Sequence, residues 1–546
     1  MGPIQSHRVD SPLVSPPWIR TFAAGSAASN RGAPQLKSPT PMRLRLAPIG
    51  ITLVAFVGAL IIAMPATAAV ERPNIILLMG DDHGWDETGY NGHPFLKTPV
   101  LDEMARTGLR LDRFYSAAPF CSPTRGSVIT GRHPNRYGTF TPGCSIRAEE
   151  ISIAQILHKG GYATGHFGKW HLGPVKVDSP TNPGAMGFDE WVSHDNFFEL
   201  NPYFSRNGGA PVQIRGESSE IVIAETVRFI DNARQRGKPF FVVVWFGSPH
   251  EPYQALPKDL ALYDKLPANF GAKRVKLTSN ETGKNVERLQ RDVLRERFAE
   301  ITAMDRAIGQ LRTHLATTGL RENTFVSYCG DNGTPQEAVV TVPFRAHKGA
   351  VYDGGLRVPG VIEWPAKITR ARVSDVPTVT SDLLPTLCEL AGQPVPKRPL
   401  DGISLVALLD GKMSARPTPI YFWNGRPRST DDGARKPYIN PEQQKGTTPL
   451  VKLGPNGEPT RDFQNFHHPD IKEQDFEGPR AVLDNRYKLV VDGARDSGKE
   501  LFDIRNDPAE KNNLIKAQPA IAAKLEQQLR TWQQSVLESL TTADYK

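Results

Sequence analysis

Cysteine is scarce in this chain: its 546 residues include only four cysteines, at positions 121, 144, 329 and 388. Four cysteines are too few to stabilise a chain of this length through disulfide bonds, and their spacings match no zinc-binding pattern. Cys329 lies in a strand-like segment and Cys388 in a helix-like segment, where a cysteine is most often a small buried apolar residue. Cys121 differs because it directly precedes a Ser-Pro pair.

The chain also has little excess charge once its first residues are set apart. The formal net charge is +8, but residues 1–69 hold six lysines and arginines and one acidic residue, a net +5. The difference, +8 minus +5, leaves a charge of +3 for the remaining residues. A balance this close to neutral gives no reason to expect a nucleic acid partner.

A long apolar run, residues 46–64, follows a basic stretch that begins at Met42, and Pro65 and four small residues come after it. This order is typical of a secretory signal peptide and its cleavage site, with Met42 as the true start. A membrane anchor is the alternative, because the run is close to the roughly 20 residues that span a bilayer. Pro48 and Gly50 favour cleavage. We therefore expect a leader and signal peptide over residues 1–69, and a secreted or periplasmic protein that uses the export machinery.

Beyond this leader, short apolar runs alternate with amphipathic stretches. The runs cover residues 74–79, 162–167, 240–246 and 324–329, and the helical patterns cover residues 152–161, 220–237 and 295–319. This alternation is typical of an α/β domain built on a largely parallel sheet.

The sequence pattern of the chain changes near residue 420. We predict a catalytic domain over residues 70–420 and a smaller C-terminal domain over residues 421–546. A long polar insertion at about residues 426–478 interrupts the smaller domain, residues 480–493 read as a hairpin, and residues 518–540 read as a closing helix.

Acidic side chains follow two of the apolar runs. Asp81 and Asp82 come after the first run, and Asp331 and Asn332 after the fourth. Because open α/β sheets collect ligands at the carboxyl ends of their strands, we expect these residues to lie together. Three carboxylates in one place repel each other unless a cation joins them, and oxygen ligands select Ca²⁺ or Mg²⁺. The sequence therefore predicts a site for a hard cation.

Basic side chains follow the other two runs. Lys169 and His171 come after the second run, where the alternation of an extended segment places them on the same side. His250 follows the third run, and Lys348 lies in a glycine-rich loop. One edge of the sheet would then hold a cation, two histidines and two lysines. This combination suits a substrate whose transferred group is a tetrahedral oxyanion.

Cys121 falls at a predicted helix start, with Ser122 as the N-cap and Pro123 as the first helical residue. The positive end of a helix favours anions, and Arg125, one turn further on, reaches back toward the same point.

At these residues the chain resembles the sulfatase family of the alkaline phosphatase superfamily, from about Asn74 to Leu514. The most specific element is the Cys-x-Pro-x-Arg signature at Cys121, Pro123 and Arg125, continued by GSVITGRHPNRYG. Further similar segments, such as GYATGHFGKWHLG and ELFDIRNDPAEKNNL, follow in family order. The resemblance implies an alkaline-phosphatase-like large domain with a mixed, mostly parallel sheet between helices. It also implies a small C-terminal α+β domain with an antiparallel sheet.

The resemblance also implies the chemistry. A formylglycine-generating or equivalent maturation enzyme oxidises Cys121 to Cα-formylglycine, whose aldehyde hydrate attacks sulfur. The family's metal ligands correspond to Asp81, Asp82, Asp331, Asn332 and modified Cys121. Its active-site cations and acid or base groups correspond to Arg125, Lys169, His171, His250 and Lys348. In this scheme, His250 protonates the departing alcohol, and His171 takes a proton when sulfate is released. The chain departs from the family pattern at His83, where leucine is common, and at Asp353, where glutamate is usual.

We therefore expect an exported, calcium-dependent sulfuric ester hydrolase, with Mg²⁺ as the alternative ion and a sulfated carbohydrate as its substrate. Three alternatives stay open at this point. They are a phosphomonoester or phosphodiester hydrolase of the same superfamily, a thiol enzyme that uses unmodified Cys121, and a non-catalytic binder of sulfated glycans.

Overall fold

A computed structural model of the chain describes residues 72–279, 284–425, 436–450, 459–493 and 498–545. The predicted leader and signal peptide lie outside the described residues, as do two parts of the polar insertion. Residues 68–546 form one compact unit. Within the described ranges, no helix has both the length and the apolar composition needed to cross a membrane.

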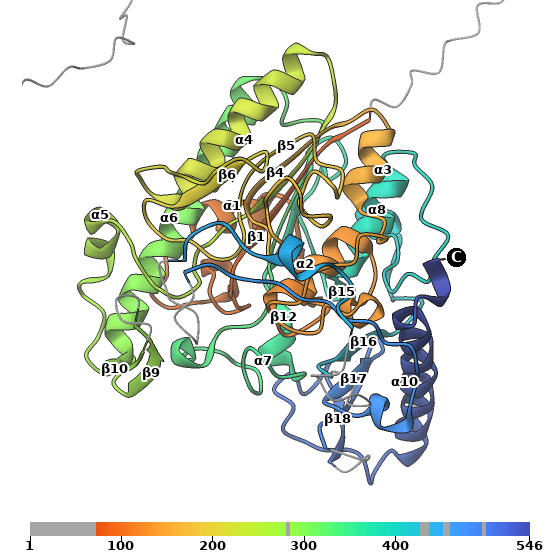
Figure 1. The fold of residues 1–546 in the computed structure, drawn as a ribbon. Coiled ribbons are helices and arrows are strands. Elements are labelled where there is room, and N and C mark those ends of the chain that lie inside the picture. The colour runs from red at the N-terminus through yellow and green to blue at the C-terminus, as the bar shows by residue number, and fades with distance from the viewer. Residues whose placement is uncertain (1–71, 280–283, 426–435, 451–458, 494–497, 546) are drawn as a thin grey trace, which may run out of the picture. The chain divides into compact units, whose positions relative to one another are not determined.

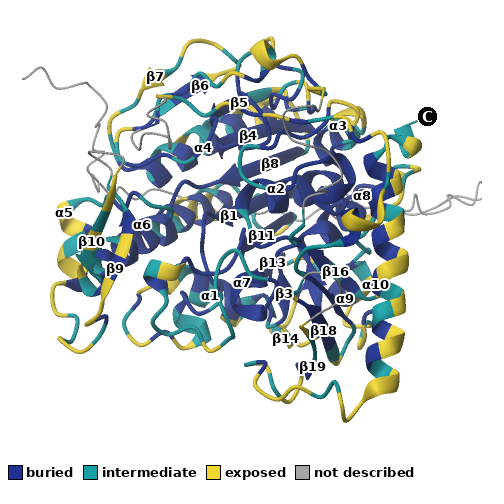
Figure 2. Ribbon diagram, turned by 60° about the horizontal axis from the view of Figure 1, so that its bottom comes forward, coloured by how far each residue is buried: buried dark blue, intermediate teal, exposed yellow. Residues whose placement is uncertain are grey.

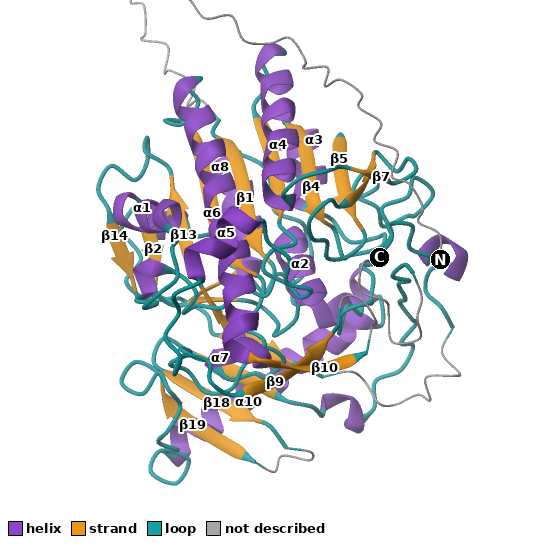
Figure 3. Ribbon diagram, turned by 90° about the vertical axis from the view of Figure 1, so that its left-hand side faces the viewer, coloured by secondary structure: helices purple, strands orange, loops and turns teal. Residues whose placement is uncertain are grey.

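A ten-stranded mixed sheet forms the centre of this unit (Figures 1 and 3). Its strands, in spatial order, are β14 (Arg372–Ser374), β2 (Leu109–Leu111), β13 (Gly360–Glu363), β11 (Thr324–Gly330), β1 (Asn74–Gly80), β8 (Phe240–Trp245), β4 (Ala163–Lys169), β5 (Glu190–His194), β6 (Tyr203–Arg206) and β7 (Val212–Gln213). The strands from β11 through β5 run parallel to one another, whereas β13 and β6 are antiparallel to their inner neighbours. The sheet is therefore mostly parallel, as predicted.

Helices cover both faces of this sheet, which explains why its central strands are apolar without alternation. Ile75 and Leu77 of β1 pack into a core on one face, and Ile76 and Leu78 into a core on the other. The helices that contribute to the first core are α2 (Cys121–Thr130), α3 (Ile153–Lys159), α8 (Leu383–Leu390) and α9 (Val406–Leu409). The helices on the second face are α1 (Pro99–Thr107), α4 (Ser218–Gln235) and α6 (Gln290–Thr317). Figure 2 shows the resulting buried central layer.

A separate four-stranded antiparallel sheet forms the C-terminal part. Its strands, in order, are β16 (Ile420–Trp423), β17 (Arg480–Leu483), β18 (Tyr487–Val491) and β19 (Lys499–Asp503). The long helix α10 (Pro519–Leu540) packs on one face through an apolar core that includes Leu489 and Leu529. The other face packs against residues of the larger part, among them Tyr115 and Leu356.

Smaller elements complete the chain. They are a three-stranded sheet of β12 (Arg357–Val358), β3 (Phe114–Tyr115) and β15 (Thr378–Val379), a hairpin of β9 (Arg274–Thr278) and β10 (Asn285–Leu289), and the one-turn helices α5 (Pro257–Leu260) and α7 (Asp353–Leu356).

The predicted strands and helices are present, with ends shifted by a few residues. The four apolar runs form β1, β4, β8 and β11, and these four are neighbours in the order β11, β1, β8, β4. The three helical patterns form α3, α4 and α6, and residues 480–493 form the β17–β18 hairpin. The fold class is confirmed. The domain boundary near residue 420 stays a prediction, although the antiparallel sheet starts there.

Candidate active site

The proposed site residues lie at the carboxyl ends of the four central strands. Asp81 and Asp82 follow β1, Lys169 ends β4, and Asp331 follows β11. Backbone hydrogen bonds join these ends, because the N–H of Asp81 donates to Ser248 O (3.0 Å) and the N–H of Asp331 donates to Gly80 O (3.2 Å). The parallel register of the strands therefore brings residues far apart in sequence to one edge, the expected ligand position of an open α/β sheet.

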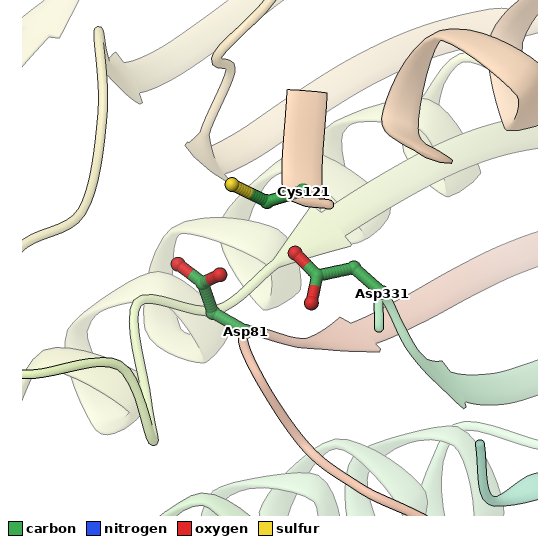
Figure 4. A group of neighbouring side chains, drawn as sticks. All are labelled: Asp81, Cys121 and Asp331. Atoms are coloured by element: carbon green, nitrogen blue, oxygen red, sulfur yellow. The ribbon is translucent and has the colours of Figure 1, made fainter. Parts of the chain in front are cut away.

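Three buried carboxylates meet at this edge. The backbone N–H of Asp82 donates to Oδ1 of Asp331 (2.8 Å), and one ligand atom each of Asp81, Asp331 and Cys121 lie within 4.8 Å of one another. Figure 4 shows the carboxylates of Asp81 and Asp331 at their strand ends, below the start of the helix that carries Cys121. Burial and the neighbouring charge of Asp81 raise the pKa of Asp331 to about 7. This acidic cluster is electrostatically unfavourable without a counter-charge.

Some oxygen atoms of this cluster lack partners that a cation would supply. Oδ1 of Asp81 and Oδ1 of Asn332 are buried, and neither has a hydrogen-bond partner within the described residues. The amide nitrogen of Asn332 donates to Oδ1 of Asp82 (2.9 Å), which leaves the amide oxygen free for a metal. Buried carboxylate and amide oxygens are the ligands that Ca²⁺ and Mg²⁺ prefer. The residues present thus fit the predicted hard cation.

Three basic side chains surround the carboxylates. Nζ of Lys169 lies 2.6 Å from Asp81 Oδ2, Nη2 of Arg125 lies 2.7 Å from Asp331 Oδ2, and Nζ of Lys348 lies 2.6 Å from Asp82 Oδ1. Burial alone raises the pKa of Asp82, but the charges of Lys348 and His250 outweigh it, so this pKa is lowered. Arg125 also packs its guanidinium 5.1 Å from the centre of the Trp245 ring. The site therefore combines three basic side chains with a buried acidic cluster that could hold a metal ion.

Cys121 is the first residue of α2, and this helix start differs from the prediction. The N-cap is Phe120, not Ser122, and Pro123 is the third helical residue. Proline is tolerated throughout the first helical turn because an N–H there has no partner within the helix. Ser122 Oγ makes no capping bond within the described residues. Cys121 still lies at the positive end of the helix, and all ten residues of α2 are buried.

His171 reaches the site by a backbone turn and not by the predicted strand alternation. The chain leaves the extended conformation after Lys169, since His171 has a left-handed φ of 57°. The backbone N–H of His171 donates to the carbonyl of Asp195 (3.1 Å), which follows β5. Burial is the main reason that the pKa of His171 is well below its usual value, and the charge of Lys169 lowers it further. The imidazole is therefore neutral and available to accept a proton.

His250 lies beside the acidic cluster, with Nε2 3.7 Å from Asp82 Oδ2. Its ring stacks on Phe197 with centroids 4.6 Å apart and an interplanar angle of 9°. Burial lowers the pKa of His250 to about 4, against the opposing charges of Asp82 and Asp81. Sequence patterns did not single out Phe197, because it follows β5, a strand that was not predicted, and a phenylalanine there looks like an ordinary core residue.

Arg297 of α6 is a second residue that the sequence analysis missed. Its guanidinium pairs with Glu87 (2.5 Å) and donates to the backbone carbonyl of Asp82 (2.6 Å) and to that of Pro249. This fully buried side chain ties the loop after β1, which carries Asp82, to the loop that carries His250. An arginine within an amphipathic helix pattern reads as a solvated residue, so only the fold reveals this contact.

Comparison with known proteins matches residues 73–393 to the Sulfatase family model. The chain belongs to the sulfatase family.

Curated relatives of this sulfatase agree with that match. It is 30% identical to N-acetylgalactosamine-6-sulfatase from Mus musculus over 402 residues, which cover 66% of this chain and 70% of the relative. It is 31% identical to an ulvan-active sulfatase from Formosa agariphila over 339 residues, covering 61% and 63% of the two chains.

Solved structures share the fold of this sulfatase. Its structure is similar to the crystal structure of Ps i-CgsB in complex with k-i-k-neocarrahexaose, with a TM-score of 0.67 and 23% sequence identity. That likeness covers 85% of this sulfatase and 93% of the other chain. The chain is thus a sulfatase with an alkaline-phosphatase-like fold, and sulfate ester hydrolysis is its reaction class.

Proposed function

We propose that this sulfatase is an exported enzyme that removes sulfate from a sulfated carbohydrate, using a formylglycine made from Cys121 and a bound Ca²⁺ or Mg²⁺. The observation that carries the proposal is the position of Cys121. It lies at the positive end of α2, beside the buried carboxylates of Asp81 and Asp331, and one oxygen each of Asp81 and Asn332 accepts no hydrogen bond within the described residues. A covalent nucleophile and a cation would meet there.

The state of Cys121 argues against a thiol mechanism. Burial raises the pKa of its thiol, although the charges of Lys169 and Lys348 oppose this effect. A thiol with a raised pKa is a poor nucleophile, because the thiolate is the reactive form. Formylglycine would supply a hydrated aldehyde instead, in which one hydroxyl attacks sulfur and the other allows sulfate to be released.

The proposed metal ligands are Asp81, Asp82, Asp331 and Asn332, together with modified Cys121. The cation, when bound, supplies Lewis acid chemistry that lowers the pKa of a coordinated hydroxyl and balances negative charge on the sulfate. Arg125, Lys169 and Lys348 hold the sulfate oxygens and stabilise the charge that develops on them. These three side chains form ion pairs with the carboxylates of Asp331, Asp81 and Asp82, which hold them beside the proposed metal ligands.

The two histidines have different proposed roles. His171, neutral and buried, has both ring nitrogens without a hydrogen-bond partner in the described part of the chain, and it accepts the proton of the formylglycine hydroxyl. His250 protonates the departing alcohol. Because its pKa is lowered to about 4, His250 is neutral in the free enzyme at pH 7. The negative charge of a bound sulfate ester favours its protonated form.

We expect replacement of His250 by alanine to reduce turnover of an alkyl or sugar sulfate by about 10²- to 10⁴-fold, the usual contribution of a general acid. A sugar alkoxide needs a proton as the S–O bond breaks, whereas a nitrophenolate leaves nearly unaided. The same variant should therefore lose far less activity on nitrophenyl sulfate. Steady-state kcat on the two substrates measures the difference.

A matched control is His314→Ala, which removes an imidazole on α6 that pairs with Asp231. It should leave both activities unchanged. Equal losses on both substrates in His250→Ala would show that His250 acts before or after the departure of the alcohol, and would contradict the general-acid role.

The proposed carbohydrate substrate is supported by the kinds of protein that this sulfatase resembles. The relatives named above include an N-acetylgalactosamine-6-sulfatase and an ulvan-active sulfatase, and one structural neighbour holds a neocarrahexaose. Sulfate release from a panel of sulfated monosaccharides and polysaccharides, with matched phosphate esters, tests the proposal. We expect the sulfated sugars to be cleaved. Faster turnover of the phosphate esters would overturn the sulfate specificity.

Export is the last part of the proposal. Residues 1–69 carry the basic stretch and the apolar run, but none of the proposed site residues. Removal of this segment would leave the whole active site in place, and N-terminal sequencing of the exported protein should show a mature chain that begins near Val70.

A further inference from the structure

The polar insertion of the C-terminal part is held against the catalytic part beside the active site. Asp195, directly after β5, accepts hydrogen bonds at Oδ2 from the backbone N–H groups of Thr447 (2.6 Å) and Thr448 (2.8 Å). The N–H of Asp195 in turn donates to Oγ1 of Thr448 (2.8 Å). Since the carbonyl of Asp195 also accepts from the N–H of His171, one residue fixes both the insertion and a proposed catalytic histidine.

A second anchor fixes the later part of the insertion. The N–H of Gln464 donates to Gly143 O (2.9 Å), and its carbonyl accepts from the N–H of Ser145 (2.9 Å). The side chain of Asn465 donates to the carbonyls of Tyr137 (2.9 Å) and Ser145 (2.8 Å). These hydrogen bonds attach the segment around residue 461 to the catalytic part of the chain.

These anchors bring Phe463 and Arg461 to His171. The buried Phe463 ring meets the His171 ring edge to face, with centroids 6.1 Å apart. Arg461 is close enough to act on His171, since its charge is second only to that of Lys169 among the charges that lower the pKa of this histidine. Geometry gives the same neighbourhood, because Arg461 lies two residues before Phe463 and its guanidinium packs against Gly143, with Nε 3.7 Å from the position that a Cβ would take there.

Arg461 differs from Arg125, which is paired with Asp331 at 2.7 Å. Within the described ranges, no carboxylate forms an ion pair with Arg461, and its Nε is buried without a hydrogen-bond partner. The backbone carbonyl of Gln444 accepts from the N–H of Phe463, and the buried side-chain amide of Gln444 has no partner there. A partly buried guanidinium with an unpaired N–H donor is suited to bind an anion.

We propose that Arg461 binds a second anionic group of the substrate, either a carboxylate or a further sulfate on the same glycan, while the ester to be cleaved lies at Cys121. This inference rests on the proposed function and narrows it. The substrate class becomes glycans with two neighbouring negative groups, and the polar insertion is the part of the chain that recognises the second one.

The test compares Arg461→Gln and Arg461→Lys with the unchanged enzyme on four substrates. These are nitrophenyl sulfate, a sugar with one sulfate, and two versions of that sugar that carry an added carboxylate or an added second sulfate. For the preferred doubly charged sugar we expect Arg461→Gln to raise KM by about 10- to 100-fold with little change in kcat, the scale of a lost charge-assisted hydrogen bond. The lysine variant should recover part of the loss, and the two singly charged substrates should be unaffected.

Lys445→Gln is the matched control, because it removes one positive charge from the same insertion at an exposed residue that pairs with Glu442. It should leave every KM unchanged. Equal losses on all four substrates, or a wild-type enzyme without preference for either doubly charged sugar, would overturn the inference while sulfatase activity stood. Failure of the wild-type enzyme on every sulfate ester would instead overturn the proposed function.

Discussion

Replacing Cys121 with alanine is expected to abolish sulfate release, with a loss of at least about 10⁴-fold, the scale seen when a nucleophile is removed. The reason is that Cys121 carries the proposed nucleophile, at the start of α2 and with its sulfur within 4.8 Å of carboxylate oxygens of Asp81 and Asp331. The proposed sulfate-binding side chains remain in the variant, because Arg125, Lys169 and Lys348 do not depend on the thiol. Sulfate esters should therefore still bind the variant and compete with one another for the site.

Mass spectrometry of the peptide that contains Cys121 tests whether this residue is oxidised to formylglycine. In the active enzyme, the peptide should have the lower mass of an aldehyde in place of a thiol. Cys144→Ser is the matched control, since a serine can keep the hydrogen bond with Thr141 and this residue lies outside the proposed metal ligands. Full activity in protein whose Cys121 is entirely unmodified thiol would contradict the formylglycine proposal.

Loss of the cation should have the second largest effect. Treatment with a chelator followed by dialysis is expected to lower turnover by roughly 10³-fold or more, because the cation activates the nucleophile and balances the charge of the sulfate. Ca²⁺ or Mg²⁺ should restore activity, and whichever ion restores more at equal concentration is the better fit. Asp331→Asn should show the same loss without recovery.

Protein stability and pH give independent measurements of the same site. Added Ca²⁺ should raise the melting temperature of the chelated enzyme, because an ion that binds only the folded state stabilises it. The apparent affinity for the ion should fall as the pH drops below about 7, since Asp331 carries a proton there and must lose it to bind metal. Asp231→Asn is the control and should alter neither quantity, because Asp231 is a partly exposed residue that pairs with His314, away from the proposed metal ligands. Full turnover at saturating chelator would rule out the metal site.

Much of the site could be predicted because it depends on strand ends. Asp81, Lys169 and Asp331 each follow or end a continuous apolar run, and parallel pairing brings such ends together whatever the loops do. The order of the four strands could not be read from these runs, because it depends on crossovers through helices. The short strands β2 and β13 were also missed, since three or four residues carry too little periodicity to stand out.

Local geometry and contacts across the fold were harder to predict. The capping preferences of serine and proline favoured a helix start at Ser122, but the helix begins at Cys121 because the backbone of Phe120 can serve as the cap. His171 has a left-handed backbone conformation that no residue pattern predicts. Arg461 lies 290 residues further along the chain than His171. Its place beside the site depends on hydrogen bonds to the backbone around residues 143–145.

The complete burial of α2 bears on when the proposed oxidation of Cys121 can take place relative to folding. Cys121 is 2% exposed in the folded chain, and every other residue of its helix is buried as well. If Cys121 is oxidised as proposed, the oxidising enzyme would need access to the Cys-x-Pro-x-Arg signature, which is buried in the folded chain. The proposed oxidation would then precede folding. A chain that folded first would keep an unmodified thiol and stay inactive, so the active fraction of a preparation would measure how many chains were oxidised before they folded.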